Sequence, residues 1–204
     1  LMNVSELGLK GKHNTKNAMA ASMAATLLQA RKETIAESLL DFEGVEHRLE
    51  NVQRVNGVQY INDSKATNSD AAAQALKSYK NIYWIAGGLA KAEGIAPLEP
   101  QFAHISKAYL IGEAAPAFHK TLTHAGVKHK VSGTLELAIL CAVRDALNAR
   151  HDNPVILLSP ACASFDQFKS FEARGDAFRE LAIKLIDTFI APFNPVSRRA
   201  LVAG

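Results

Sequence analysis

Unbroken apolar segments, which end in glycine or in Ser-Pro, alternate with helical patterns along most of the chain. Residues 81–88 (NIYWIAGG), 104–112 (HISKAYLIG) and 153–160 (NPVILLSP) are the clearest of these segments. A strand covered on one face alternates apolar and polar residues, whereas a strand covered on both faces is apolar throughout. Such strands separated by helices are typical of a parallel sheet with helical crossovers. The sequence therefore predicts an α/β fold, with a mostly parallel sheet and helices on both faces.

Turn and capping residues locate the remaining elements. Asn56-Gly57 lies between two short apolar runs within residues 50–63, which predicts a β-hairpin because both turn residues need positive φ angles. Thr134 is a favoured N-cap residue and Gly126 a favoured C-terminal cap. A further strand is predicted at residues 128–133, and helices are predicted at residues 14–31, 32–42, 70–79, 113–126, 134–150 and 175–189.

Charge and hydropathy argue against two classes of partner. The net charge is +3 and the basic residues are scattered, so nucleic-acid binding is not expected. No apolar run reaches the roughly 18–20 residues of a membrane span.

The two cysteines, Cys141 and Cys162, form no CxxC or Cys/His pattern, and Cys141 falls in an apolar helix, which indicates a buried free thiol. A reducing cytoplasm is the expected compartment.

Polar residues concentrate where the predicted strands end. Ligands of parallel sheets bind in the crevice beyond the carboxyl ends of the strands. In the loop at residues 62–68, a helix cap explains Asn68. It does not explain Asp63, Lys65 and Thr67, which we expect to face one crevice. The loops in question are residues 62–68, 86–91, 111–115 and 159–168.

The second loop places Gly87, Gly88 and Lys91 after a strand. Glycines let the backbone approach an anion and lysine adds a positive charge, although a plain turn with a solvated lysine has the same pattern. The chain contains neither GxGxxG nor GxxxxGK[ST]. It therefore has no recognisable phosphate loop of its own.

The fourth loop contains Ser164, which is predicted to cap a helix beginning at Phe165 and to leave N–H groups for an anion. The spacing of Phe165, Phe168 and Phe171 is typical of a core face. Without a GxSxG motif, a nucleophilic serine is not favoured.

A histidine metal site is not expected either, since a five-residue spacing spreads side chains around a helix. The histidines, which are expected at the surface, include His47, His119, His124 and His129.

Five segments, taken together and in order, resemble the Mur ligase family. The resemblance extends over residues 5–190. The HN…N, HR and DSKATN elements are shared across the family, whereas SPACAS-DQF is similar to the members that add D-glutamate. The segments are GKHNTKNAMAA, GVEHRLE, YINDSKATN, the AGG…K loop and LLSPACASFDQFKSFEARGDAF.

The resemblance implies a domain organisation. Members of the family have a UDP-binding domain, a central ATP-binding domain and a C-terminal Rossmann-like domain. Residues 1–44 would be the helical end of the central domain, residues 45–190 the C-terminal domain that seats the incoming amino acid, and residues 191–204 a tail. The phosphate loop and the Mg²⁺ ligands of the family are expected upstream, so this chain alone is expected to be inactive and to hold no metal ligand.

The resemblance also implies a reaction and its residues. ATP phosphorylates the carboxylate of UDP-N-acetylmuramoyl-L-alanine, and the amine of D-glutamate attacks the acyl phosphate, in the synthesis of peptidoglycan precursors. Lys65 is implied as the catalytic residue at the reacting phosphate. The other residues implied are Asn14, Asn17, Arg48 and Asp63 for ATP, and Thr67, Lys91, Ser164, Phe165 and Phe171 for D-glutamate.

Two other functions fit the same pattern. One is another Mur-type or folylpolyglutamate-type ligase that receives a different amino acid, and the other is a binding module without catalysis. The SPACASFDQF segment favours D-glutamate. The expected partners are therefore D-glutamate, UDP-N-acetylmuramoyl-L-alanine and ATP with Mg²⁺, and the chain is expected to be a monomer.

Overall fold

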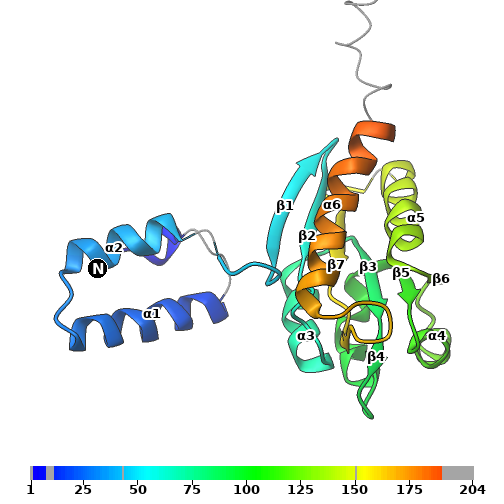
Figure 1. Cartoon of the computed structure of the whole chain (residues 1–204), viewed down its shortest axis with the longest axis horizontal. Helices are drawn as coiled ribbons and strands as arrows, with labels where there is room; N and C mark the ends of the chain where they lie inside the picture. Colours follow the sequence, from blue (N-terminus) through cyan, green and yellow to red (C-terminus); the bar gives the residue numbers. More distant parts are fainter. Residues whose placement is uncertain (1, 8–11, 43, 150, 190–204) are drawn as a thin grey trace, which may run out of the picture. The chain divides into compact units, whose positions relative to one another are not determined.

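A computed structural model describes residues 2–7, 12–42, 44–149 and 151–189. The chain divides into two compact units, Leu1–Val45 and Glu46–Gly204, which are described separately (Figure 1). The domain boundary expected from the sequence lies after residue 44. The predicted tail, residues 191–204, lies outside the described residues.

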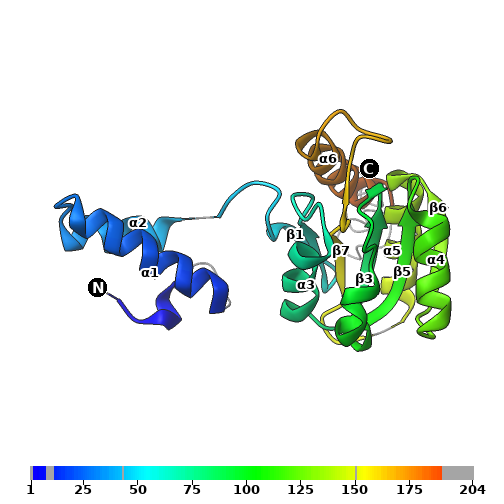
Figure 2. The ribbon, with the colours of Figure 1, turned by 90° about the horizontal axis from the view of Figure 1, so that it is seen from below.

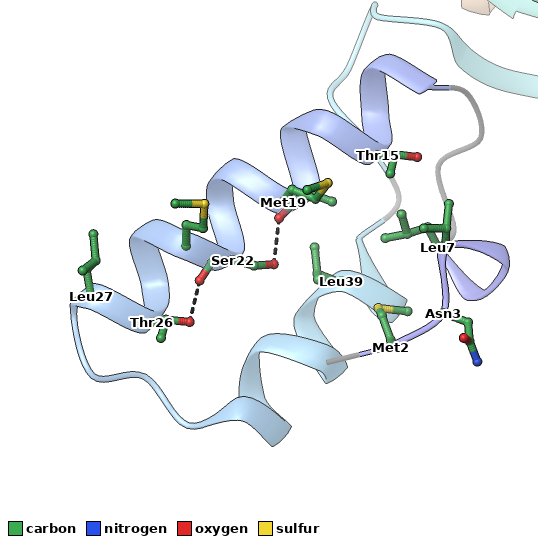
Figure 3. A pocket seen from close by; sticks show the side chains of 12 residues that line it. Met2, Asn3, Leu7, Thr15, Met19, Ser22, Thr26, Leu27 and Leu39 are labelled. Carbon is green, nitrogen blue, oxygen red and sulfur yellow. Dashed lines mark hydrogen bonds between the residues drawn. The ribbon is translucent and has the colours of Figure 1, made fainter.

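The described residues of the first unit form a 3₁₀ turn and two helices. The turn is η1 (Val4–Glu6), and the predicted helices are confirmed as α1 (Lys12–Leu27) and α2 (Lys32–Asp41). These elements line an apolar groove, which Figure 3 shows from close by. Methionines from α1 line it but remain largely exposed to solvent. Among the described residues, this unit therefore does not close a core of its own. The groove is lined by Met2, Asn3, Val4, Leu7, Thr15, Ala18, Met19, Ser22, Met23, Thr26, Leu27 and Leu39.

The second unit is built on a six-stranded sheet with the order β1-β2-β7-β3-β5-β6. The edge strand β1 is antiparallel to β2, and every other neighbouring pair is parallel. The mostly parallel sheet predicted from the sequence is thus confirmed. The strands are β1 (Glu50–Val55), β2 (Val58–Asn62), β3 (Ile82–Gly87), β5 (Ile105–Ile111), β6 (His129–Gly133) and β7 (Val155–Leu158).

Helices cover both faces of this sheet, as the apolar strands require (Figure 2). Successive strand residues alternate between two cores: Ile61 packs with α3, α4 and η2, whereas Tyr60 packs with α5 and α6. Because both sides are buried, neither side carries the polar residues of an exposed face. The helices are α3 (Ser69–Ser78), η2 (Ala96–His104), α4 (Ala115–His124), α5 (Leu135–Asn148) and α6 (Phe171–Phe189), and a small second sheet pairs β4 (Leu89–Ala90) with β8 (Cys162–Ala163).

Local signals in the sequence explain several of these boundaries. Asn56 and Gly57 have φ angles of 50° and 81°, which confirms the predicted hairpin turn. The Thr134 side chain accepts a hydrogen bond from the Leu137 N–H at the start of α5. The Asn68 side chain accepts one from the Ala71 N–H at the start of α3. The predicted caps of these two helices are therefore confirmed.

The segment before α6 differs from its prediction. No helix begins at Phe165; instead the Ser164 carbonyl closes a single turn, and α6 starts at Phe171. The reason lies in Asp166, whose carboxylate accepts a hydrogen bond from the Glu113 N–H and holds the segment against the start of α4. Ser170 supplies the cap of α6 by accepting from the Ala173 N–H. The side chain of Phe165 is 69% exposed, so the prediction that it belongs to a core is wrong.

Within the part of the chain that the structure describes, no helix combines the length and the hydropathy of a membrane span. Cys141 is a buried free thiol, as predicted from its apolar helix.

The backbone at Gly87 generates a first prediction. Gly87 has a φ of +128°, and a Cβ atom there would lie 2.0 Å from the Ile111 carbonyl oxygen on the neighbouring strand. Gly57 also has a positive φ, but it has open space around it. We expect Gly57→Ala to cost about 1–2 kcal/mol of unfolding free energy, the usual strain of a left-handed residue. Gly87→Ala should cost more than about 4 kcal/mol or prevent folding.

Urea unfolding followed by the fluorescence of Trp84, the only tryptophan of the chain, measures both variants. Equal losses of stability in the two variants would contradict a steric role of the Ile111 backbone.

Candidate functional site

Three loops converge at one edge of the sheet. They follow β2, β7 and β3, which are adjacent and parallel, so their carboxyl ends lie side by side. Such an edge is where open α/β sheets bind ligands. The loops contain residues 63–68 after β2, 159–170 after β7 and 88–94 after β3. The candidate site is built from these three loops and the first turns of α6.

Asp63 lies inside the protein at this edge. Its carboxylate accepts hydrogen bonds from the Ser159 hydroxyl at 2.8 Å and from the Leu49 N–H at 3.2 Å. Burial raises the pKa of Asp63 to about 7, although these two bonds and the charge of Arg48 act in the opposite direction. Asp63 therefore points inward, whereas Lys65, two residues later, is exposed.

Lys65 and Phe171 meet across the loops. The Lys65 ammonium lies 4.6 Å from the centre of the Phe171 ring, within the range of a cation–π contact. Beneath this pair, the Ser64 hydroxyl donates to the Phe171 carbonyl oxygen at 2.7 Å. The Ser64 hydrogen bond thereby attaches the loop after β2 to the first residue of α6, and the exposed Lys65 lies over the Phe171 ring at this contact.

Arg174 is the residue that the sequence analysis missed. It is only 1% exposed, and burial lowers the pKa of its guanidinium to about 10. Its nitrogens donate to the Ser64 hydroxyl (3.0 Å), the Ser64 carbonyl (2.9 Å) and the Cys162 carbonyl (3.0 Å). Its remaining nitrogen, Nη1, is buried, has no hydrogen-bond partner among the described residues and lies beside Gly88. One side chain thus touches all three loops.

A signal for Arg174 was present in the helical spacing. Arg174 lies three residues after Phe171 and four before the buried Phe178, so it falls on the buried stripe of α6. Arginine is rarely fully buried unless its donors are satisfied. A cation on an apolar stripe therefore predicts an internal binding partner, which here is backbone and hydroxyl oxygen.

His47 is also a buried polar residue beside this site, contrary to the prediction of a surface histidine. It lies 3.0 Å from the amide of Asn62 and 3.8 Å from the carboxylates of Glu50 and Asp176. A Cβ atom at Gly175 would collide with its ring, which is why the ring fits against α6. The pattern of the sequence did not predict this burial, because all of these partners except Glu50 come from distant segments.

The predicted D-glutamate residues take up different environments. Ser164 is buried, Thr67 is half-buried, and Lys91 is exposed. The β4–β8 pair brings the chain just before Ser164 against Gly88, and the crowding is close enough that a Cβ at Gly88 would lie 2.3 Å from the Ala163 carbonyl oxygen. Thr67, Lys91 and Ser164 therefore share one edge of the sheet, each on a different loop.

The predicted ATP residues are divided between the two units. Arg48 and Asp63 belong to the second unit, where the charge of Arg48 acts on Asp63. Asn14 and Asn17 lie on α1 in the first unit. Across the described residues, there is no group of three or more histidine, cysteine, aspartate or glutamate side chains arranged to hold a metal ion. The exposed cations of the loops suit an anionic ligand.

The raised pKa of Asp63 generates a second prediction. The folded chain binds this proton more tightly than the unfolded chain, so the contribution of Asp63 to stability is greatest near pH 4 and is lost as the pH rises to about 7. Asp63→Asn removes this dependence. Between about pH 4 and pH 7, the variant should therefore gain stability relative to the parent, by at most about 4 kcal/mol.

Urea unfolding at several pH values, followed by Trp84 fluorescence, measures this difference. Asp152→Asn, at an exposed loop position, is the matched control. A difference between parent and Asp63→Asn that does not vary with pH would show that Asp63 titrates at its ordinary pKa.

Comparison with known proteins shows the family to which the chain is similar. A family model described as "Mur ligase, glutamate ligase domain" matches residues 47–162, more than half of the chain. The UDP-N-acetylmuramoylalanine–D-glutamate ligase of Mesorhizobium japonicum is 54% identical over 174 residues, which are 85% of this chain and 37% of that enzyme. The enzyme of the same name from Nitrobacter hamburgensis is 53% identical over 173 residues, with the same shares. The chain thus spans about 37% of the length of these relatives.

Two solved structures have a fold similar to that of this chain. The UDP-N-acetylmuramate-alanine ligase MurC of Thermotoga maritima has a TM-score of 0.61 at 15% identity, over 87% of this chain and 39% of that one. A pseudomurein peptide ligase type C from Methanothermus fervidus has a TM-score of 0.59 at 19% identity, over 88% and 37%. At these identities the likeness concerns the fold alone. With the family model matched across most of the sheet, the chain belongs to the Mur ligase family.

Proposed function

We propose that this chain is the amino-acid-binding part of an ATP-dependent ligase that adds D-glutamate to UDP-N-acetylmuramoyl-L-alanine in peptidoglycan precursor synthesis. The observation that carries the proposal is the meeting of three loops at one sheet edge, with exposed cations above a buried guanidinium. The relatives named above, at 54% and 53% identity, support D-glutamate as the amino acid. Such a ligase would act in the cytoplasm.

D-glutamate carries two carboxylates and an amine that must reach an acyl phosphate. In the proposed seat, the Lys91 ammonium and the hydroxyls of Thr67 and Ser164 bind the carboxylates through charge-assisted hydrogen bonds. The backbone at Phe165 and Phe171 completes the seat. Holding the amine in a fixed place lowers the barrier because the reactants no longer have to meet from solution.

Lys65 is proposed to act at the reacting phosphate. Its ammonium is exposed while its backbone N–H donates to the His47 carbonyl, so a fixed main chain carries a mobile charge. A cation there would stabilise the negative charge that develops when the amine attacks. Arg48 is proposed to contact ATP, and so is Asp63 after a side-chain movement that exposes its buried carboxylate. Asn14 and Asn17 are proposed to contact adenine.

Magnesium would screen the phosphate charges of ATP when bound. We propose that its ligands belong to the part of the relatives that this chain does not span, and that the chain's own residues hold D-glutamate. The first unit fits the end of a central ATP-binding domain, because its apolar groove leaves α1 methionines exposed and needs further protein to cover it.

The proposed seat generates a third prediction. Joining the chain to the preceding part of the Mesorhizobium japonicum ligase gives a full-length protein in which the KM for D-glutamate can be measured. Lys91→Ala should raise that KM by about 10- to 100-fold, since a lost charge-assisted hydrogen bond costs about 1.5–3 kcal/mol. Lys77→Ala, which removes an exposed lysine from α3, is the matched control and should leave the KM unchanged.

An unchanged KM in Lys91→Ala would remove Lys91 from the seat. L-glutamate serves as a second substrate in the same assay. Ligation of L-glutamate in preference to D-glutamate would favour a folylpolyglutamate-type activity instead.

A fourth prediction concerns the chain by itself. Supplied with ATP, Mg²⁺, D-glutamate and UDP-N-acetylmuramoyl-L-alanine, it should release no phosphate above background, because its sequence has no phosphate loop. The joined full-length protein should release phosphate under the same conditions. Phosphate release by the chain alone that depends on D-glutamate would contradict this division of roles.

A further inference from the structure

Two histidines lie side by side at the far end of the sheet from the candidate site. His119 is on α4 and His129 is the first residue of β6. Their ring centres are 4.8 Å apart, and His119 Nδ1 lies 2.7 Å from His129 Nε2. The prediction that five-residue spacing spreads these histidines around a helix is wrong for this pair. The chain reverses at Gly126, which has a φ of +68°, and returns His129 alongside the helix.

A backbone contact determines which nitrogen of His129 carries a proton. His129 Nδ1 lies 2.7 Å from the Val127 carbonyl oxygen. A carbonyl oxygen can only accept, so Nδ1–H is the donor and Nε2 presents its lone pair toward His119. Metal-binding histidines are oriented by the same kind of contact, in which the other ring nitrogen donates to a carbonyl.

We propose that His119 and His129 form a binding site for a divalent late first-row transition-metal ion of the zinc and copper class. Imidazole nitrogen suits these ions, whereas magnesium prefers oxygen ligands. Binding replaces the proton shared between the two rings with the metal ion, and the proton moves to the other nitrogen of His119 or to solvent. The Thr123 hydroxyl, 3.5 Å from His129 Nε2, lies close enough to bind a water ligand of the ion.

Binding a metal ion between the two histidine nitrogens requires only a small movement of the rings. Two nitrogens bound tetrahedrally at about 2.0–2.1 Å from zinc lie about 3.4 Å apart. The present separation of 2.7 Å must therefore widen by less than about 1 Å. His119 is an exposed side chain on the surface of α4, so a change of its rotamer can supply this movement without disturbing the core.

The site is independent of the proposed D-glutamate seat. β6 is the opposite edge strand from the β1–β2 hairpin, and three strands separate it from β2. His129 lies at the amino end of its strand, while the candidate site lies at the carboxyl ends. A bound ion would join α4 to the edge strand β6, and it would stabilise the folded chain because the unfolded chain does not bring the two rings together.

Isothermal titration of the untagged chain with Zn²⁺, Cu²⁺ and Mg²⁺ tests the proposal. We expect one ion per chain, tighter binding of Cu²⁺ than of Zn²⁺, and no binding of Mg²⁺. His119→Gln and His129→Gln should each weaken Zn²⁺ binding at least about tenfold. His124→Gln, which changes an exposed histidine on the same helix, should leave it unchanged.

A thermal unfolding series provides the second measurement. Zn²⁺ should raise the melting temperature of the parent chain and of His124→Gln, but not that of His119→Gln or His129→Gln. Circular dichroism establishes that each variant is folded before titration. Zinc affinity that is the same in all four proteins, or absent from the parent, would overturn the proposal.

Discussion

One buried guanidinium connects the loops on which the candidate site depends. Arg174 donates to the Ser64 and Cys162 carbonyls and to the Ser64 hydroxyl, and it lies beside Gly88. Together these contacts reach all three loops, so one buried side chain links them from below, in addition to the direct pairing of β4 with β8. A cation hidden from water is costly unless its donors are satisfied, and this cost ties the loops to one arrangement.

Polar groups at this edge are arranged in two layers with different tasks. The inner layer, which includes Asp63 and His47, is buried and bonded to neighbouring backbone and side chains. The outer layer, which includes Lys65 and Lys91, is exposed and keeps its charge available to a ligand. Rigid support beneath mobile charge is what a site for a small anionic substrate needs, since the charge must reach the ligand without moving the backbone.

Much of the fold was predictable because its signals are local. Apolar runs, the Asn56-Gly57 turn and the caps at Asn68 and Thr134 act over a few residues, and each matches the structure. The predicted helix at Phe165 failed because a distant contact, from Asp166 to the start of α4, outweighed the local preference. The burial of His47 was missed for the same reason, since Asn62 and Asp176 lie far away in the sequence. The burial of Arg174, by contrast, could have been predicted from its place on the buried stripe of α6.

By itself the sequence determined the order of most elements, the parallel sheet with two covered faces and the polar loops at the carboxyl ends of its strands, because periodicity and turn chemistry are properties of short segments. The tertiary structure alone decided which polar residues of those loops turn inward. Asp63 and Lys65 are two residues apart in one loop, yet one is buried and the other is exposed. Likewise, only the reversal of the chain at Gly126 brought His119 to His129. Burial and proximity depend on the packing of distant segments, which no local pattern contains.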